Sequence, residues 1–219
     1  MCIRDRYKSK LLSSVEGISY NFGSKSIEPV KRNIFTLNQI HSSKVIFLEN
    51  TQELRKSIDG DAIVTTQKGF NIGVKTADCV PILLTDVNAT FVAAIHSGWR
   101  GTYHKIITNT LDLIFKKLKI NPRDIVGSLG PSISLPNYEV SEDMWIKFKK
   151  KFNDSGTSLK EKNNKFFIDL SKINISLLKS SGVTRIDMIN ECTYSNNDFY
   201  SYRRDKSLTA NQISNIMLN

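Results

Sequence analysis

Residues 80–118 have the sequence VPILLTDVNATFVAAIHSGWRGTYHKIITNTLDLIFKKL, which contains two apolar runs followed by a helical pattern. The runs at 80–85 and 90–96 are almost continuously apolar, as expected of strands that are buried on both faces. Residues 86–89 separate the runs and suit a hairpin connection. Residues 106–118 carry apolar side chains at i, i+3, i+4 and i+7, which predicts an amphipathic helix with lysines near its C-terminal end.

Strand and helix patterns alternate along the rest of the chain. We expect strands over 33–37, 44–48, 62–66, 72–75, 125–129 and 186–189, the last of them central in its sheet. We expect helices over 141–152, over 168–180 and near 211–218. Short strand-to-strand connections occur as well, so we predict a mixed α/β fold in which helices cover a mixed β-sheet core. We predict one domain over residues 1–219, in which residues 1–7 are disordered or do not belong to the native protein.

Composition limits the class of protein. The chain has 219 residues, of which 40% are hydrophobic and 24% charged, as in ordinary globular domains. It contains no apolar run of the ~20 residues that a membrane span needs, and its first residues do not resemble a secretory signal. Its three cysteines are too few for a disulfide scaffold and indicate a reducing compartment, so we expect a cytoplasmic protein with no membrane partner.

The formal net charge is +10. Lysines are densest over 147–165, where polar residues follow the expected helix, so this segment is interpreted as a helix end and an exposed loop. A nucleic-acid site would interleave aromatic side chains with its basic residues, and we therefore expect no nucleic-acid partner. A small anionic substrate such as phosphate is compatible with the charge.

A strand-to-helix turn follows His96. Gly98 and Gly101 permit a tight turn, and Thr102 is a suitable cap for the next helix. Backbone N–H groups at a helix start favour an anion, and the guanidinium of Arg100 suits phosphate or carboxylate. An ordinary turn with glycines explains the same residues, so the pattern leaves both interpretations open.

His41, Cys79 and His96 are candidate metal ligands. Each lies at the end or start of an expected strand, and two imidazoles with one thiolate suit a catalytic zinc site that keeps one position open. Each also has a structural explanation, as a hydrogen-bonded histidine or a buried cysteine. The separations of 38 and 17 residues match no short zinc motif, so the residues alone do not decide between the two explanations.

Six ordered motifs resemble one family. They are NQIH, GDAIVTT, TADCVPILLTD, HSGWRGT, GPSI followed by YEV, and FYSYRRD, and they span roughly residues 34–210. In this order they resemble the YfiH-like family, earlier described as multicopper polyphenol oxidases or laccase-domain proteins. Two stretches differ from the family pattern. Few residues lie between 22–26 and NQIH, and residues 209–212, TANQ, stand where the family often has TGRQ.

The resemblance implies a zinc ion held by His41, Cys79 and His96, with copper as the weaker alternative. It also implies purine nucleoside phosphorylase activity on adenosine, inosine and methylthioadenosine, together with adenosine deamination. The partners would be purine nucleosides and phosphate, and the oligomeric state is left open. The alternatives are copper-dependent phenol oxidation, a hydrolase linked to peptidoglycan editing with Cys79 as nucleophile, and an inactive basic binding module.

Further residues receive roles in this hypothesis. Arg100 and the backbone of Gly101 and Thr102 are the candidates for binding phosphate, and Asp78 is a candidate proton carrier or a strand-end cap. The cluster after the last strand could stack a base and bind phosphate, or form a structural Arg–Asp network; it contains Tyr200, Tyr202, Arg203, Arg204 and Asp205. His104 and Cys192 are not expected to bind metal.

Overall fold

The computed structural model describes residues 7–26, 34–49, 57–152, 158–206 and 210–219. Its strands are β1 (Ile18–Asn21), β2 (Val45–Leu48), β3 (Ala62–Thr65), β4 (Ile72–Thr76), β5 (Val80–Asp86), β6 (Val92–Ser97), β7 (Ile125–Leu129), β8 (Glu139–Val140), β9 (Leu159–Lys162), β10 (Lys165–Ile168), β11 (Arg185–Met188) and β12 (Gln212–Leu218). Its α-helices are α1 (Lys10–Ser13), α2 (Trp99–Tyr103), α3 (Ile106–Leu118), α4 (Glu142–Phe152), α5 (Leu170–Ser180) and α6 (Tyr202–Asp205).

A six-stranded mixed sheet forms the centre of the molecule. Its strand order is β11-β7-β5-β6-β3-β2, and the two edge pairs are parallel while the three inner pairs are antiparallel. The predicted hairpin joins β5 to β6, and the Asp86 carboxylate closes it by accepting hydrogen bonds from the backbone N–H and hydroxyl of Thr90. The predicted mixed α/β fold is therefore confirmed.

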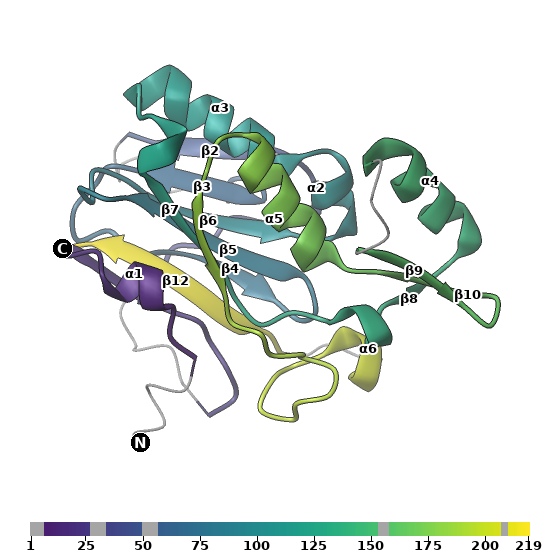
Figure 1. The fold of residues 1–219 in the computed structure, drawn as a ribbon. Coiled ribbons are helices and arrows are strands. Elements are labelled where there is room, and N and C mark those ends of the chain that lie inside the picture. Colours follow the sequence, from purple (N-terminus) through teal and green to yellow (C-terminus); the bar gives the residue numbers. More distant parts are fainter. Residues whose placement is uncertain (1–6, 27–33, 50–56, 153–157, 207–209) are drawn as a thin grey trace.

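The central sheet is covered on both faces (Figure 1). Helices α3 and α5 pack on one face, where apolar side chains such as Leu84, Ile107 and Leu178 are buried. A second sheet, β1-β12-β4, packs with α1 on the other face and buries a second core that includes Phe22, Leu83 and Ile216. A small third sheet, β8-β10-β9, lies with α4 at one end of the molecule.

The expected C-terminal helix near 211–218 is wrong, because this segment is strand β12. It pairs with β1 on one side and with β4 on the other, so it is the middle strand of its sheet. Burial alternates along it, but two of the buried residues are the polar Gln212 and Ser214. These polar residues hide the period of two from a hydrophobicity pattern.

Other expectations need smaller corrections. Strand β11 lies at the edge of the large sheet and is not central. The segment expected as a strand over 33–37 forms only a bridge between Phe35 and Ile72 within its described part. The loop expected after α4 contains the hairpin of β9 and β10.

The sequence predicts that residues 1–7 are disordered or non-native. Residues 1–6 lie outside the described residues, whereas Tyr7 is described. Tyr7 is instead buried, and its hydroxyl donates a hydrogen bond to the Asp198 carboxylate. None of the helices in the described part of the chain is long and apolar enough to cross a membrane.

Candidate active site

His41, Cys79 and His96 converge at one end of the central sheet. His96 belongs to β6 and Cys79 precedes β5, and these strands are antiparallel neighbours that pair Val80 with Ser97. His41 reaches the same place from the segment before β2, with a left-handed backbone (φ 55°). The possible ligand atoms of the three side chains lie within 4.8 Å of one another, so they form a possible metal site.

Gly98 leaves room for this cluster. A Cβ atom at this position would lie 2.9 Å from Cys79 Sγ, 3.4 Å from His41 Cδ2 and 3.8 Å from His96 Nε2. The backbone of Gly98 has a φ of −76°, which any L-residue can adopt, so the glycine is needed for space and not for conformation. The absent side chain leaves a space among the side chains of the three ligand candidates.

Asp61 organises the cluster from behind. One carboxylate oxygen, Oδ1, lies 2.8 Å from His96 Nδ1 and also accepts the backbone N–H of His41 at 3.0 Å. The other, Oδ2, accepts the backbone N–H of Ser42 at 2.6 Å and its hydroxyl at 2.7 Å. A metal bound at Nε2 would displace the proton there and leave the Nδ1 proton with Asp61, as in metal sites whose histidines are oriented by carboxylates.

The electrostatics favour a thiolate at Cys79. Burial by itself would raise the pKa of the thiol, but the charge of His96 and hydrogen bonds from His41 and His96 outweigh it and lower the pKa to about 6. Burial would likewise lower the pKa of His96, but the Cys79 charge and the Asp61 hydrogen bond raise it to about 9. The deprotonated sulfur is the form that binds metal.

The segment that carries His41 is anchored at two points. The Asn38 side chain donates a hydrogen bond to the Asp59 carboxylate at 2.7 Å. The Gln39 amide pairs with the backbone of Lys75, accepting its N–H at 2.7 Å and donating to its carbonyl at 2.8 Å. The first contact ties the segment to the residues before β3 and the second ties it to the end of β4, and together they hold the segment that carries His41.

A cavity of about 750 Å³ opens beside the cluster. Besides the three ligand candidates it is lined by the cationic residues Lys75, Arg100 and Arg203, by the aromatic residues Trp99, Tyr138 and Tyr202, and by Leu37, Asn38, Gln39, Thr76, Ala77, Asp78 and Asn211. Burial raises the pKa of Tyr138, as does the charge of Cys79, so its hydroxyl stays protonated. Aromatic walls, cations and a metal-type cluster therefore share one space large enough for a small molecule.

Asp78 lies in the cavity wall, but its carboxylate already has partners. Thr193 Oγ1 donates to Oδ1 at 2.6 Å, and the backbone N–H of Arg203 donates to Oδ2 at 2.7 Å. The residue has a left-handed backbone with φ 87°, which is unusual for a residue with a Cβ. Asp78 thus holds the start of α6 against the segment that bears Cys79.

The turn after β6 differs from the expectation in one respect. Helix α2 begins at Trp99 with Gly98 as its N-cap, so Thr102 lies inside the helix and is not a cap. Its N–H is bonded to the Gly98 carbonyl, and its buried hydroxyl contacts Ser97 and Asn174. Gly101 is also buried, whereas the exposed guanidinium of Arg100 stacks 4.7 Å from the Trp99 ring centroid in the cavity wall.

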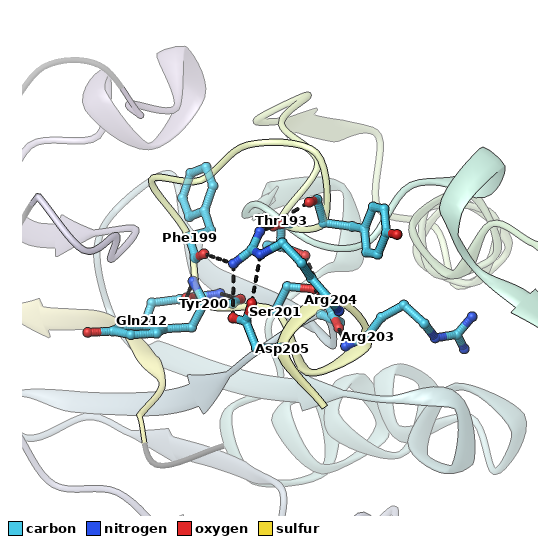
Figure 2. A network of polar contacts seen from close by, with 10 residues as sticks. Thr193, Phe199, Tyr200, Ser201, Arg203, Arg204, Asp205 and Gln212 are labelled. Atoms are coloured by element: carbon cyan, nitrogen blue, oxygen red, sulfur yellow. Dashed lines mark hydrogen bonds and ion pairs between the residues drawn. The ribbon is translucent and has the colours of Figure 1, made fainter. Parts of the chain in front are cut away.

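Arg203 and Arg204, which belong to the cluster at residues 200–205, have different surroundings (Figure 2). All five N–H donors of the Arg204 guanidinium are used, by the Asp205 carboxylate and by the carbonyls of Thr193, Tyr194 and Phe199. Arg203 extends away from this network, stacks on Tyr138 and donates to the Glu139 carbonyl. Arg203 and the exposed Tyr202 line the cavity, whereas Arg204 holds the loop together.

His104 and Cys192 lie apart from the metal-type cluster. His104 is exposed and is the C-cap of α2, at the end of the helix and not inside it. Cys192 Sγ accepts hydrogen bonds from the backbone N–H of Ser134 and the side chain of Asn137. In the described part of the chain, the one group of three metal-type side chains is His41, Cys79 and His96.

Sequence reasoning did not assign Asp61 or Tyr138. Asp61 stands in the GDAIVTT motif directly before a buried strand, and an acid at that place is a signal for a buried partner. Tyr138 belongs to the YEV motif, but its aromatic ring gives no local sign that it faces a cavity.

Comparisons with known proteins agree with the motifs. A family model described as multi-copper polyphenol oxidoreductase laccase matches residues 22–219. A Bacteroides thetaiotaomicron protein named purine nucleoside phosphorylase is 35% identical over 175 residues, which cover 77% of this chain and 65% of that protein. An Aquifex aeolicus protein of the same name is 36% identical over 177 residues, with 81% and 79% covered. The chain therefore aligns with about two thirds of the Bacteroides protein's length.

The fold also matches a solved structure. The crystal structure of YfiH from Bacillus licheniformis superposes with a TM-score of 0.86 over 98% of this chain and all of that one. Its sequence identity is 19%, so this similarity concerns the fold alone.

Proposed function

The chain belongs to the family described as multi-copper polyphenol oxidoreductase laccase, and on this premise we propose that it is a zinc-dependent purine nucleoside phosphorylase. Its substrates would be phosphate with adenosine, inosine or methylthioadenosine, and it would also deaminate adenosine. The names of the Bacteroides and Aquifex relatives support the phosphorylase activity. The observation that carries the proposal is the His41, Cys79 and His96 cluster in the wall of a cavity with cationic and aromatic sides.

The donor set fits zinc. Two imidazole nitrogens and one thiolate are typical zinc ligands, and three protein ligands leave a fourth position open, as catalytic sites do. The space that a Gly98 Cβ would fill lies among these three side chains. When bound, zinc supplies a Lewis-acid charge and lowers the pKa of a coordinated water to about 7.

Copper is the weaker alternative. The family description names several coppers, whereas the residues that the structure describes contain one cluster of three such ligands. That cluster includes no methionine of the kind that completes blue-copper sites. Oxygen uptake with a phenol by the copper-loaded protein, in the absence of phosphorolysis, would reverse this preference.

The residues of the cavity have distinct roles in the proposal. In phosphorolysis a phosphate oxygen bonds to the anomeric carbon of the ribose as the glycosidic C–N bond breaks, and the base departs with the bonding electrons and the phosphate's proton. Arg100, exposed in the cavity wall, binds the phosphate through its planar guanidinium. Tyr138 and Tyr202 flank the base. Asp78 is assigned to positioning, because both of its carboxylate oxygens already accept hydrogen bonds.

Gly101 and Thr102 contribute to phosphate binding only through the placement of Arg100. The N–H and hydroxyl of Thr102 are engaged within the protein. Arg204 likewise supports the site through the loop that carries Tyr202 and Arg203.

The test measures release of the base from adenosine and inosine by protein of known zinc content, with and without phosphate. We expect release that depends on phosphate and forms ribose 1-phosphate in equal amount. Conversion of adenosine to inosine and ammonia would report deamination separately, since that reaction needs water and no phosphate. Absence of phosphate-dependent release from protein with stoichiometric zinc would refute the phosphorylase proposal.

A further inference from the structure

Three buried polar side chains form a closed hydrogen-bonded triangle behind the turn that follows His96. The Ser97 hydroxyl donates to Asn174 Oδ1 at 3.0 Å, and Asn174 Nδ2 donates to Thr102 Oγ1 at 3.2 Å. The Ser97 and Thr102 hydroxyl oxygens are 2.9 Å apart. Because the single proton of Ser97 goes to Asn174, Thr102 donates to Ser97, so each hydroxyl donates once and accepts once. We call these three side chains the polar triangle.

The polar triangle joins three elements of the fold. Ser97 is the last residue of β6, Thr102 belongs to α2, and Asn174 lies in α5, 72 residues after Thr102. Successive side chains of a strand face opposite sides, so His96 faces Asp61 while Ser97 faces α5. The turn after β6 is therefore held by Asp61 on one side and by the polar triangle on the other.

Helix α2 has little else to fix it on the side of the core. It has five residues, too few for a helix that is stable by itself, and its N-cap Gly98 has no side chain. Trp99 and Arg100 are exposed, and Gly101 is buried but also lacks a side chain. Within α2, which the structure describes in full, Thr102 carries the one buried side chain, and the hydroxyl of that side chain belongs to the polar triangle.

We propose that Asn174 is a positioning residue of the phosphate site. Through the polar triangle it fixes α2 on the end of β6 and thereby sets where the Arg100 guanidinium lies beside the metal-type cluster. The inference rests on the proposed function for the role of Arg100, whereas the placement of α2 can be measured without substrate. A planar amide both donates and accepts, so one side chain can bridge the two hydroxyls, and a buried network of this kind specifies one arrangement.

The first experiment measures the placement of α2 by fluorescence. Trp99 is the first residue of α2, is 37% exposed and lies under the Arg100 guanidinium. The chain has two tryptophans, and the other, Trp145, lies in α4 outside the cavity, so a Trp145→Phe background leaves Trp99 as the reporter. We expect Asn174→Ala in this background to increase the quenching of Trp99 by acrylamide, a neutral quencher that the nearby cations do not attract.

Ser97→Ala and Ser171→Ala form a matched pair of variants. Each removes one buried hydroxyl, but Ser171 lies on α5 three residues before Asn174 and bonds to Ser132, and neither of these two serines lines the cavity. Both variants should lower the melting temperature by roughly 2 to 4 °C. Only Ser97→Ala should also increase the quenching of Trp99, and it replaces Asn174→Ala in the test if that variant does not fold.

The second experiment measures phosphate binding to the zinc-loaded protein by titration calorimetry without nucleoside. We expect Asn174→Ala to bind phosphate roughly five- to tenfold more weakly, because Arg100 is no longer held in place. Zinc content should be unchanged, since Asp61 still orients His96. In turnover, the KM for phosphate should rise by a larger factor than kcat falls. Ser171→Ala should bind phosphate as the wild type does.

Three results would overturn the role of Asn174. They are wild-type quenching of Trp99 in both Asn174→Ala and Ser97→Ala, an equal increase in Ser171→Ala, and increased quenching with wild-type phosphate affinity. A wild-type protein that neither binds phosphate nor catalyses phosphorolysis would refute the proposed function and the phosphate part of this inference. The quenching comparison would still decide whether Asn174 positions α2.

Discussion

Asp61 Oδ1 lies 2.8 Å from His96 Nδ1, and both side chains are buried. The same carboxylate holds the backbone of His41 and Ser42, so one acid orients two of the three ligand candidates. Hydrogen bonds from His96 and Ser42 outweigh the effect of burial and lower the pKa of this carboxyl, which keeps it charged.

Asp61→Asn should weaken the metal site. The substitution replaces one of the two acceptor oxygens by an NH₂ group. This NH₂ group would face hydrogen-bond donors, either those of Ser42 or those of His41 and His96. Loss of such an orienting partner typically lowers metal affinity by roughly 10- to 100-fold. Chelator competition measures this affinity. Asp112→Asn is the control, because Asp112 is an exposed acid on α3; equal losses in both variants would contradict the role of Asp61.

Cys79→Ala and His96→Ala should each lose most of their zinc. Each substitution removes one of three ligands, whereas His104→Gln changes an exposed residue away from the cluster and should keep full zinc. Metal analysis of the purified variants is the measurement. Full zinc in Cys79→Ala, combined with fast alkylation of Cys79 in the wild type, would point to the thiol-hydrolase alternative, since a metal-bound thiolate is not a free nucleophile.

Gly98→Ala should impair the site without preventing folding. Its backbone conformation tolerates alanine, but the added Cβ would lie 2.9 Å from Cys79 Sγ. We expect reduced zinc content and reduced activity, with a circular dichroism spectrum like that of the wild type. A variant with full zinc and full activity would show that the space beside Gly98 has no role in the site.

Arg100→Lys tests the phosphate site. Lysine keeps the charge but loses the planar fork, so zinc content should be intact while the KM for phosphate rises and phosphorolysis slows by about tenfold, or ~1.4 kcal/mol. Deamination needs no phosphate and should suffer less. Arg185→Lys, at an exposed position on the edge strand β11, is the control. Equal losses in both reactions with a lower melting temperature would indicate a structural role for Arg100.

Arg204→Lys should lower the stability of the protein. Lysine cannot reproduce five hydrogen bonds from one planar group, and three of the acceptors are backbone carbonyls. We expect a loss of about 2 to 3 kcal/mol in the free energy of unfolding, measured with denaturant. Arg203→Lys should lose less stability but more affinity for the nucleoside, because Arg203 lines the cavity. The reverse order of effects would exchange the roles of the two arginines.

Local patterns in the sequence were sufficient to predict the helix and strands at the centre of the fold. The β5–β6 hairpin and α3 have continuous apolar runs or a clear helical period, and their boundaries agree with the predictions within two residues. Such patterns work because each buried face is formed by residues near one another in the chain. The order of the six motifs likewise pointed to the family.

The properties of the site depend on contacts between distant segments. His41, Cys79 and His96 were recognised as residues, but their spacing within 4.8 Å follows from the pairing of β5 with β6 and from the Gln39–Lys75 contact. The orienting role of Asp61 and the saturation of Arg204 arise from partners up to 35 residues away. Strand β12 is a strand because β1 and β4, both far from it in sequence, supply hydrogen bonds on its two sides. Burial and hydrogen-bond partners of this kind are set by packing across the whole chain, and no local period encodes them.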